Sequence, residues 1–395
     1  MRGDPEPHGA RGTVLFVGLH HKNLRITIRE LVRRGYRVRV LASLGKPRLL
    51  TEEDGVDRSP IMRSAEPPRF IPKETRRILK NIDDDCRLVV TPAGRTRTKH
   101  VLLAAGLRQV PAVLNFQTDC RWEVDHASRS QSIRVAAVRL FRAVQWSIHR
   151  SPSYTTSRGP GEDVRRWDLV FVPHAVEPTL AEPPQLPSSP LRVLSVTQCA
   201  PGKNNSGLIS VAQRCREEDI DFTVVFSCDR DCKGCRGAVI DAFRADVEAS
   251  GVERVRVLPR MPDITHLYRT HHVVVRNSVH EGANYTLIEG ASEGCIPVGS
   301  PESGGAYGYL EDGRSGYVVP GADDAGYARV LVGLLEDPAG RERMRAAALR
   351  FARSHCGPEV LADFLEQHMS DADRRGVRRI AIEDSAARTG RDGRI

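Results

Sequence analysis

A proline-rich segment divides the chain and sets the strongest limit on its fold. Residues 177–190, EPTLAEPPQLPSSP, hold five prolines. Proline fixes φ and lacks a backbone N–H, so this segment cannot form a helix interior or a central strand. Strand and helix patterns alternate on both sides of it. With 395 residues, the chain is too long for one ordinary α/β core and long enough for two, which predicts two α/β domains joined by a linker.

The half before the linker has the pattern of a βαβ series. Short β-branched runs bounded by turn residues indicate buried strands, and apolar residues at helical spacing indicate helices. Strands that alternate with helices pair in parallel, so this half predicts a doubly wound parallel sheet. The expected strands are residues 13–18, 36–42, 87–94 and 111–119, and the expected helices are residues 23–35 and 95–108.

The half after the linker repeats the alternation and then turns helical. The predicted fold class is therefore α/β, with two Rossmann-like domains that face each other across a cleft between the carboxyl edges of their sheets. The expected strands are residues 191–198, 221–227, 252–259, 271–279 and 295–300, with helices at 204–218, 261–270, 286–294 and from 323 to about 368. The expected organisation is a disordered N-terminus (1–12), an N-terminal domain (13–178), a linker (179–190), a C-terminal domain (191–345), C-terminal helices (346–370) and a disordered tail (371–395).

Composition narrows the class of partner. No apolar run approaches the ~20 residues that a membrane span needs, and the N-terminal residues lack the apolar core of a signal peptide, so we expect a cytoplasmic protein. The net charge is +9, but aromatic residues make up only 5% of the chain and the charge is spread along it. This argues against nucleic acid as a partner and favours small anionic ligands.

A basic amphipathic stretch at residues 128–150 has two interpretations. Its apolar residues follow a helical stripe, from Ile133 to Ile148, with arginines between them. We favour a helix packed on the protein surface. Contact with a membrane surface or with an acceptor is the alternative.

Two glutamates eight positions apart mark the candidate site. Glu281 falls in an expected strand-to-helix loop, and Glu289 falls one turn inside the expected helix 286–294. In a parallel sheet this loop lies at the carboxyl edge, where a helix amino terminus suits a phosphate. The two carboxylates would then accept hydrogen bonds from hydroxyl groups beside that phosphate. The alternative is structural, because Thr286 and Glu289 also fit an S/T-x-x-E capping box.

The second half resembles retaining glycosyltransferases of the GT-B fold, glycosyltransferase family 4 in particular. The E-x7-E motif from Glu281 to Glu289 carries the resemblance, with the Gly304-Gly305 turn and the segment EDGRSGYVVP behind it. Upstream, VTQCAPGKNNSGLI occupies the place of the family's Arg-x4-Lys phosphate motif, and FVPHAVEP resembles the segment that closes the first domain. The resemblance is specific over residues 191–320.

The resemblance implies a hexosyltransferase that uses a nucleotide-diphosphate sugar, of the UDP or GDP type, with retention. Glu281 and Lys203 would be the catalytic residues, with Lys203 neutralising the departing diphosphate, and Glu289 would hold the ribose. No metal or other cofactor would be required, because Lys203 and the helix terminus supply the positive charge. The remaining donor-binding residues would be Gly282, Ala283, Asn284, Tyr285, Thr286, Gln198 and His280.

The chain departs from the family pattern at several positions. The family's arginine falls at Gln198, and the common alanine after the second glutamate is Gly290. These changes keep a non-catalytic nucleotide- or sugar-binding protein as an alternative. We expect the acceptor to be a small molecule or a lipid. A natural-product scaffold would fit the composition of the chain, and a lipid would fit the basic stretch. The acceptor-binding candidates are His20, His21, Lys22 and Asp119.

The cysteines suggest a distant rival. The nine cysteines are an odd number scattered along the chain, which favours reduced thiols. Cys228, Cys232 and Cys235 have the C-x3-C-x2-C spacing of radical S-adenosylmethionine enzymes. Free loop thiols are the preferred interpretation, ahead of a structural zinc with Cys199 or Cys215 as fourth ligand. A GxGxxG fingerprint is absent after residues 13–18, which argues against a dehydrogenase.

Overall fold

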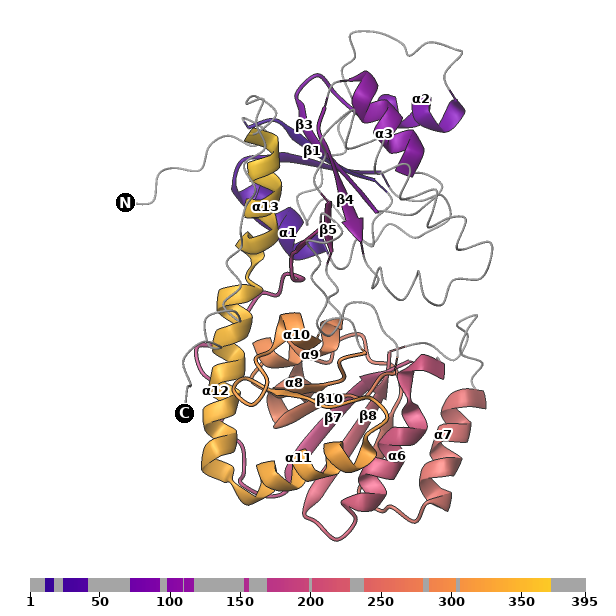
Figure 1. The fold of residues 1–395 in the computed structure, drawn as a ribbon, viewed down its shortest axis with the longest axis vertical. Helices are drawn as coiled ribbons and strands as arrows, with labels where there is room; N and C mark the ends of the chain where they lie inside the picture. Colours follow the sequence, from indigo (N-terminus) through magenta and orange to yellow (C-terminus); the bar gives the residue numbers. More distant parts are fainter. Residues whose placement is uncertain are drawn as a thin grey trace, which may run out of the picture.

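Two parallel sheets organise the protein (Figure 1). The computed structural model describes residues 11–17, 24–41, 72–92, 98–108, 110–116, 153–155, 169–198, 201–227, 238–279, 284–302 and 306–370. The first sheet has the strand order β2-β1-β3-β4-β5-β6, and all its pairings are parallel. Its strands are β1 (Thr13–Val17), β2 (Arg37–Leu41), β3 (Cys86–Pro92), β4 (Ala112–Phe116), β5 (Ser153–Thr155) and β6 (Leu169–Phe171).

The second sheet follows the linker and is also parallel throughout, with the order β12-β11-β10-β7-β8-β9. Strand β10 lies inside the sheet, between β11 and β7, and helices pack on both faces of this sheet, so all four of its residues are buried. This explains why its sequence is a continuous apolar run instead of an alternating one. The strands are β7 (Leu191–Thr197), β8 (Ile220–Phe226), β9 (Val255–Leu258), β10 (Val273–Arg276), β11 (Ile296–Gly299) and β12 (Tyr317–Val318).

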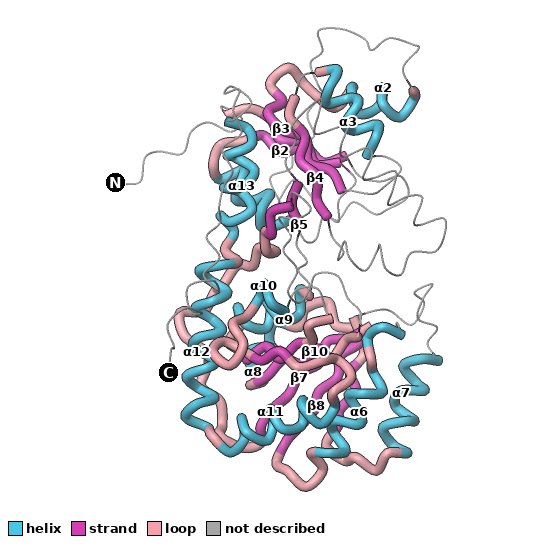
Figure 2. The backbone as a smooth tube through the Cα atoms, in the orientation of Figure 1, coloured by secondary structure: helices cyan, strands magenta, loops and turns pink. Residues whose placement is uncertain are grey.

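Helices cover both faces of each sheet, as Figure 2 shows. On the first sheet, α1 (Arg25–Arg33) packs on one face, and α2 (Lys73–Leu79) and α3 (Thr98–Leu107) pack on the other. On the second sheet, one face carries α6 (Asn205–Arg214), α7 (Ala238–Ala249) and α11 (Asp324–Glu336). The opposite face carries α8 (Thr265–Thr270), α9 (Tyr285–Ser292) and α10 (Ala306–Tyr309). The predicted α/β fold class with two Rossmann-like halves is confirmed.

The last helix returns to the first sheet. Helix α12 (Pro338–His355) packs against α9 and β11, and α13 (Pro358–Ser370) then packs beside α1, so the two helices run along one side of both halves (Figure 1). Leu361 and Leu365 join the core of the first sheet. Arg34 ties the contact together through ion pairs to Asp363 at 2.6 Å and to Glu366 at 2.5 Å. The expected boundary between residues 345 and 346 falls inside α12.

The linker is held in place by arginines. Residues 172–190 contain no helix or strand, in agreement with their proline content. The linker's Ser188 carbonyl oxygen accepts a hydrogen bond from Arg341 at 2.9 Å, and its Ala181 carbonyl oxygen accepts one from Arg353 at 3.3 Å. Both arginines belong to α12. The linker is therefore attached to α12. Two of its carbonyl groups, which have no strand partner, accept hydrogen bonds from guanidinium groups instead.

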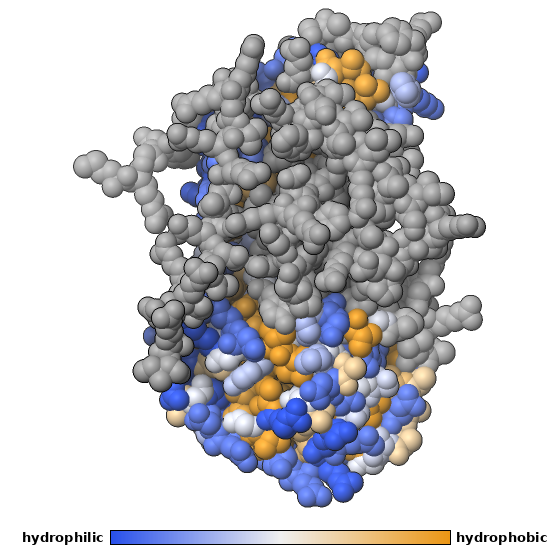
Figure 3. Space-filling model, viewed as in Figure 1, coloured by the Kyte–Doolittle hydropathy of each residue, from blue (hydrophilic) through white to orange (hydrophobic). Residues whose placement is uncertain are grey.

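Two exposed apolar side chains lie together on the described surface of the first half. Leu103 and Leu107 of α3 are exposed, and Figure 3 shows apolar surface at the top of the molecule, where α2 and α3 lie. None of the described helices combines the length and apolar content needed to cross a membrane. The basic stretch at residues 128–150 lies outside the described residues.

Two adjacent buried histidines make stability depend on pH. Burial lowers the pKa of His271 to about 4 and that of His272 to about 3. The Nδ1 atom of His272 accepts from the Arg192 N–H at 3.0 Å, while its Nε2 atom lies 3.0 Å from the Pro187 carbonyl oxygen. The neutral ring therefore has both nitrogens satisfied, and a proton on Nδ1 would displace the Arg192 N–H.

We predict that the free energy of unfolding falls as the pH drops from about 6.5, the ordinary histidine pKa, to about 4. In this window the unfolded chain binds protons that the folded chain excludes, which favours unfolding. Each histidine contributes about 1.4 kcal/mol per pH unit. Urea unfolding at several pH values measures the slope, and His272→Gln should lower it by about 1.4 kcal/mol per pH unit, the share of one histidine. An unchanged slope in that variant would show that His272 titrates normally in the folded protein.

Candidate functional site

Helix α9 presents its amino terminus at the carboxyl edge of the second sheet. It begins at Tyr285 with Asn284 as its N-cap, and no side chain makes a capping hydrogen bond there. Thr286 is the second helical residue and Glu289 the fifth, so the capping-box interpretation of this pair is wrong. The first-turn N–H groups of α9 have no partner within the helix and form the positive end of its dipole, which favours an anion.

Glu289 is held by a buried tyrosine of the neighbouring helix. Its Oε2 atom accepts a hydrogen bond from the hydroxyl of Tyr268 in α8 at 3.2 Å. Burial, together with the charge of Glu289, raises the pKa of Tyr268 well above its usual range, so the hydroxyl keeps its proton and donates. Glu289 is half-buried. The carboxylate is therefore oriented by Tyr268 and still accessible to a ligand, a partnership that the sequence did not reveal.

Gly294 ends α9 in the way the sequence predicts. Its φ is +91°, a left-handed conformation that favours glycine. The Cys295 N–H donates to the Gly290 carbonyl oxygen at 2.9 Å, and the Gly294 N–H donates to the Ala291 carbonyl oxygen at 3.2 Å. These two bonds form a Schellman motif. The turn leads directly into β11 and fixes the direction in which α9 leaves the sheet.

The departure from the family pattern at Gly290 has a packing cause. A Cβ atom at Gly290 would lie 2.5 Å from Cγ1 of Val274 in β10 and 3.4 Å from Cδ1 of Tyr268. Glycine therefore allows α9 to approach β10 closely. Since Glu289 precedes Gly290, the same close approach brings its carboxylate within reach of Tyr268.

We predict that Gly290→Ala lowers the free energy of unfolding by about 1–3 kcal/mol, because the added methyl group overpacks the contact with Val274. The gain in helix propensity, about 1 kcal/mol, offsets part of this loss. The matched test uses a Val274→Ala background, which removes the obstructing methyl groups. There Gly290→Ala should be neutral or stabilising. If it destabilises equally in both backgrounds, Val274 is not the obstruction.

The segment after β7 carries Gln198 and Lys203. The Gln198 carbonyl oxygen accepts from Nδ2 of Asn205 at 3.0 Å, and the residue itself is exposed. Lys203 closes a short 3-10 helix, Pro201–Lys203, and is half-buried. Asn204 follows with a φ of +48°. This left-handed residue turns the chain sharply and separates Lys203 from the start of α6.

Contacts to two other segments fix the turn around Lys203. The side-chain amide of Asn204 donates to the Gly321 carbonyl oxygen at 2.8 Å, and that of Asn277 donates to the Asn204 carbonyl oxygen at 3.0 Å. The N–H of Val279 donates to the carbonyl oxygen of Gly202 at 3.0 Å. Lys203 is therefore positioned by the segments that follow β7, β10 and β12.

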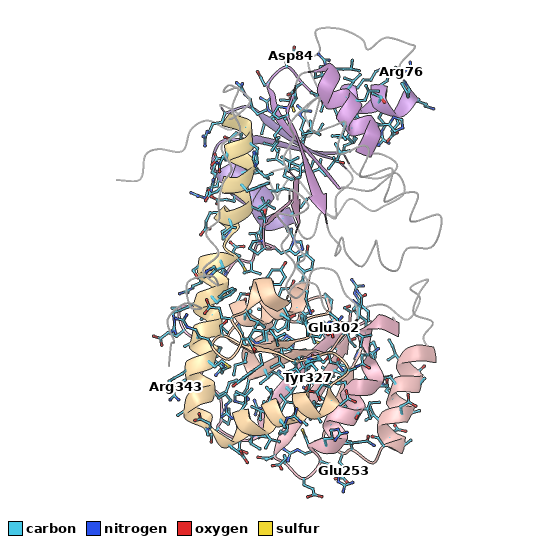
Figure 4. All side chains as sticks on the ribbon, viewed as in Figure 1. Arg76, Asp84, Glu253, Glu302, Tyr327 and Arg343 are labelled. Atoms are coloured by element: carbon cyan, nitrogen blue, oxygen red, sulfur yellow. The ribbon has the colours of Figure 1, made fainter. Side chains whose placement is uncertain are left out.

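Glu302 braces the same region from the segment after β11. Its Oε2 atom accepts from the Gly321 N–H at 3.0 Å. Glu302 and Tyr327 are both labelled in Figure 4 within the second half, with Glu302 on the side toward the first sheet. The Tyr327 hydroxyl donates to the carbonyl oxygens of Val319 at 3.0 Å and Arg276 at 3.2 Å. Neither residue was singled out from the sequence.

A second cation lies in this edge of the sheet. Arg276, the last residue of β10, is buried, and its guanidinium donates to the Val196 carbonyl oxygen at 2.7 Å. Val196 lies two residues before Gln198. A buried arginine on the strand beside β7 therefore lies near the neutral Gln198.

Several predicted site residues lie outside the described residues. These include members of the donor site, all the acceptor-binding candidates and the cysteine cluster. They are His280, Glu281, Gly282, Ala283, His20, His21, Lys22, Asp119, Cys199, Cys228, Cys232 and Cys235.

The described cysteines do not form a metal site. Cys86, Cys215, Cys295 and Cys356 are buried free thiols. Cys215, considered above as a zinc ligand, lies in the core of the second sheet, where burial raises its pKa to about 11. Within the described part of the chain, no group of three or more His, Cys, Asp or Glu side chains could hold a metal ion.

Solved glycosyltransferase structures share this architecture. A glycosyltransferase from Rickettsia africae ESF-5 superposes with a TM-score of 0.71 at 12% identity, covering 93% of this chain and 100% of that one. Anabaena Alr3699/HepE, solved in complex with UDP, superposes with a TM-score of 0.69 at 14% identity, covering 91% and 100% of the two chains. The fold is therefore the GT-B fold.

The second half also matches a sequence family. Residues 176–351 match the family model for glycosyl transferases group 1. The D-inositol 3-phosphate glycosyltransferase of Thermomonospora curvata is 37% identical over 103 residues, which are 25% of this chain and 23% of the relative. That of Arthrobacter sp. (strain FB24) is 27% identical over 219 residues, 54% and 49% of the two chains. The chain thus spans about a quarter to a half of the length of these relatives.

Proposed function

We propose that the protein is a glycosyltransferase that moves a hexose from a nucleotide-diphosphate sugar to an acceptor with retention. The observation that carries the proposal is the placement of Glu289, which Tyr268 holds, one turn from the amino terminus of α9, where no side chain makes a capping hydrogen bond. A carboxylate that accepts from ribose hydroxyls and a helix terminus that binds a diphosphate are the two features such a donor requires. The match of residues 176–351 to the glycosyl transferases group 1 family supports it.

The donor is proposed to be a UDP-sugar bound by residues 191–345, with residues 13–178 as the acceptor half. Anabaena Alr3699/HepE, which shares the fold, was solved with UDP-glucose. Lys203 would neutralise the departing diphosphate, and Glu281 would accept from hydroxyls of the transferred sugar. The backbone from Gly282 to Thr286 would contact the phosphates and the sugar.

The acceptor is proposed to be a polyhydroxylated small molecule. Several relatives of the second half are named D-inositol 3-phosphate glycosyltransferases, which supports a small acceptor, and a natural-product scaffold belongs to the same class. Lipid acceptors are the competing class. Product analysis after incubation with inositol phosphates, natural-product scaffolds and lipid extracts would separate the two classes.

The reaction is proposed to need no metal, because Lys203 and the α9 terminus offer the positive charge that the departing diphosphate requires. Turnover in excess EDTA should therefore equal turnover in Mg²⁺. Loss of activity in EDTA that Mg²⁺ restores would contradict this part of the proposal.

Ligand-protected melting tests the donor site. A nucleoside diphosphate present at about 100 times its dissociation constant should stabilise the protein by about 2.7 kcal/mol.

Glu289→Gln keeps the shape of the side chain but loses a charged acceptor, whose hydrogen bonds are worth about 1.5–3 kcal/mol. This variant should bind UDP more weakly at nearly unchanged melting temperature. Intact UDP binding in a destabilised Glu289→Gln protein would mean that the carboxylate is structural. UDP binding without release of UDP from any UDP-sugar would indicate the non-catalytic binder.

A further inference from the structure

A buried histidine from the first half meets the first residue of α9. His174 belongs to the segment that follows β6 and leads into the linker, and it is 4% exposed. Its Nδ1 atom lies 2.6 Å from the hydroxyl of Tyr285. The two rings are also in contact, with centroids 3.7 Å apart and an interplanar angle of 31°. One side chain from each half is thus joined by both a hydrogen bond and ring packing.

The chemistry of the pair follows from burial. Burial lowers the pKa of His174 well below its usual range, so the imidazole is neutral. A neutral imidazole has one accepting nitrogen, and Nδ1 is placed to accept from the Tyr285 hydroxyl. On the other side, the backbone N–H of His174 donates to the hydroxyl of Tyr309 at 3.3 Å. The ring and the main chain of His174 are therefore held by two different tyrosines.

The His174–Tyr285 pair lies beside the two chain segments that connect the sheets, the segment after β6 and the turn between α12 and α13. The Val176 N–H donates to the Cys356 carbonyl oxygen at 2.7 Å, which joins the segment leaving the first sheet to the turn between α12 and α13. Val176 and Cys356 share a core cluster with Tyr309 of α10 and with Ile288 and Ala291 of α9. The position of α9 is thus built on the chain segments that connect the two halves.

We propose that His174 is a positioning residue for donor binding that acts through Tyr285. The inference rests on the proposed function, because it assigns the donor diphosphate to the first turn of α9. Tyr285 is the first residue of that turn, so anchoring its side chain fixes the N–H groups beside it. Preorganised N–H groups bind an anion without a further ordering cost. His174 therefore contributes to the donor site without touching the donor.

The test is a double-mutant cycle on UDP affinity. Tyr285→Phe removes only the hydroxyl, and His174→Leu removes its acceptor. Each variant should weaken UDP binding by about three- to tenfold, the range expected for one lost hydrogen bond. The double variant should bind no more weakly than the weaker single variant, because the two changes remove one interaction. Titration calorimetry gives the affinities, and thermal melting of the ligand-free proteins gives the stabilities.

Tyr309→Phe is the matched control. It removes a buried hydroxyl from the same cluster, but one that accepts from the main chain of His174 and is not the Nδ1 contact to Tyr285. Its melting temperature should fall while its UDP affinity stays within about twofold of wild type. Equal losses of UDP affinity in Tyr309→Phe and Tyr285→Phe would overturn the inference, since general loosening of the cluster would then explain both.

The remaining outcomes separate the inference from the function it rests on. Tyr285→Phe changes no shape, so it decides the matter even if His174→Leu does not fold. Unchanged UDP affinity in Tyr285→Phe, with a wild type that binds UDP, defeats the positioning role alone. If the wild-type protein binds no nucleoside diphosphate, the donor site is wrong and the positioning role falls with it.

Discussion

Replacing Lys203 with alanine is expected to reduce the turnover rate by about 10²- to 10³-fold. The leaving diphosphate gains negative charge as the glycosidic bond breaks, and a fixed cation stabilises that charge most in the transition state. Hydrogen bonds from Asn277 and Val279 hold the turn that carries Lys203. The backbone is therefore already in place before the donor binds. Gln198 supplies no charge there, which leaves Lys203 as the cation that the family motif provides.

Two companion variants make this prediction specific. Lys73→Ala removes an exposed lysine from α2 and should leave turnover unchanged, which excludes a general effect of net charge. Gln198→Arg restores the family's arginine and should recover part of the lost rate in the Lys203→Ala background. Release of UDP at saturating donor measures turnover. If Lys203→Ala lowers turnover less than threefold, a group other than Lys203 stabilises the charge on the leaving diphosphate.

The largest effect on stability is expected at Arg345 of α12. Its side chain is fully buried, donates from Nε to the Gly294 carbonyl oxygen at 2.8 Å, and pairs with Glu342 at 2.8 Å. Arg345→Ala would remove this pair, leave the Gly294 carbonyl buried without its donor and open a cavity. Glu342 is 47% exposed and its carboxylate can be solvated, so the cost comes from the buried Gly294 carbonyl left without a donor, about 1–3 kcal/mol, and from the cavity. Urea unfolding should show a loss of this size.

The control lies on the same helix. Arg343 is exposed, with 75% of its side-chain surface accessible, and its nearest acid, Asp337, is 3.9 Å away. Figure 4 shows Arg343 on the outer side of α12. Arg343→Ala should change the free energy of unfolding by less than about 0.5 kcal/mol. Similar losses in the two variants would mean that helix propensity, and not the buried contact, sets the cost.

The site was predictable where local sequence carries the signal. The run VVVR in β10, the helix after it and Gly294 at its end follow from periodicity and turn chemistry alone. Motif spacing singled out Glu289 and Lys203 as site residues, and their roles stay predictions. Tyr268 and His174 could not be found in this way, because each acts on a residue 21 or 111 positions away. Strands β5 and β6 were missed because each has three residues, too few for a period to appear.

By itself, the sequence determined the α/β class, the division at the proline-rich linker and most of the central strands. These depend on hydrophobic period and on backbone restrictions, which act within a few residues. Only the tertiary structure decided that α13 returns to the first sheet, that arginines of α12 fasten the linker, and that His174 reaches α9. Such contacts join segments far apart in the chain. Their geometry depends on how whole elements pack against one another, and no local pattern encodes that packing.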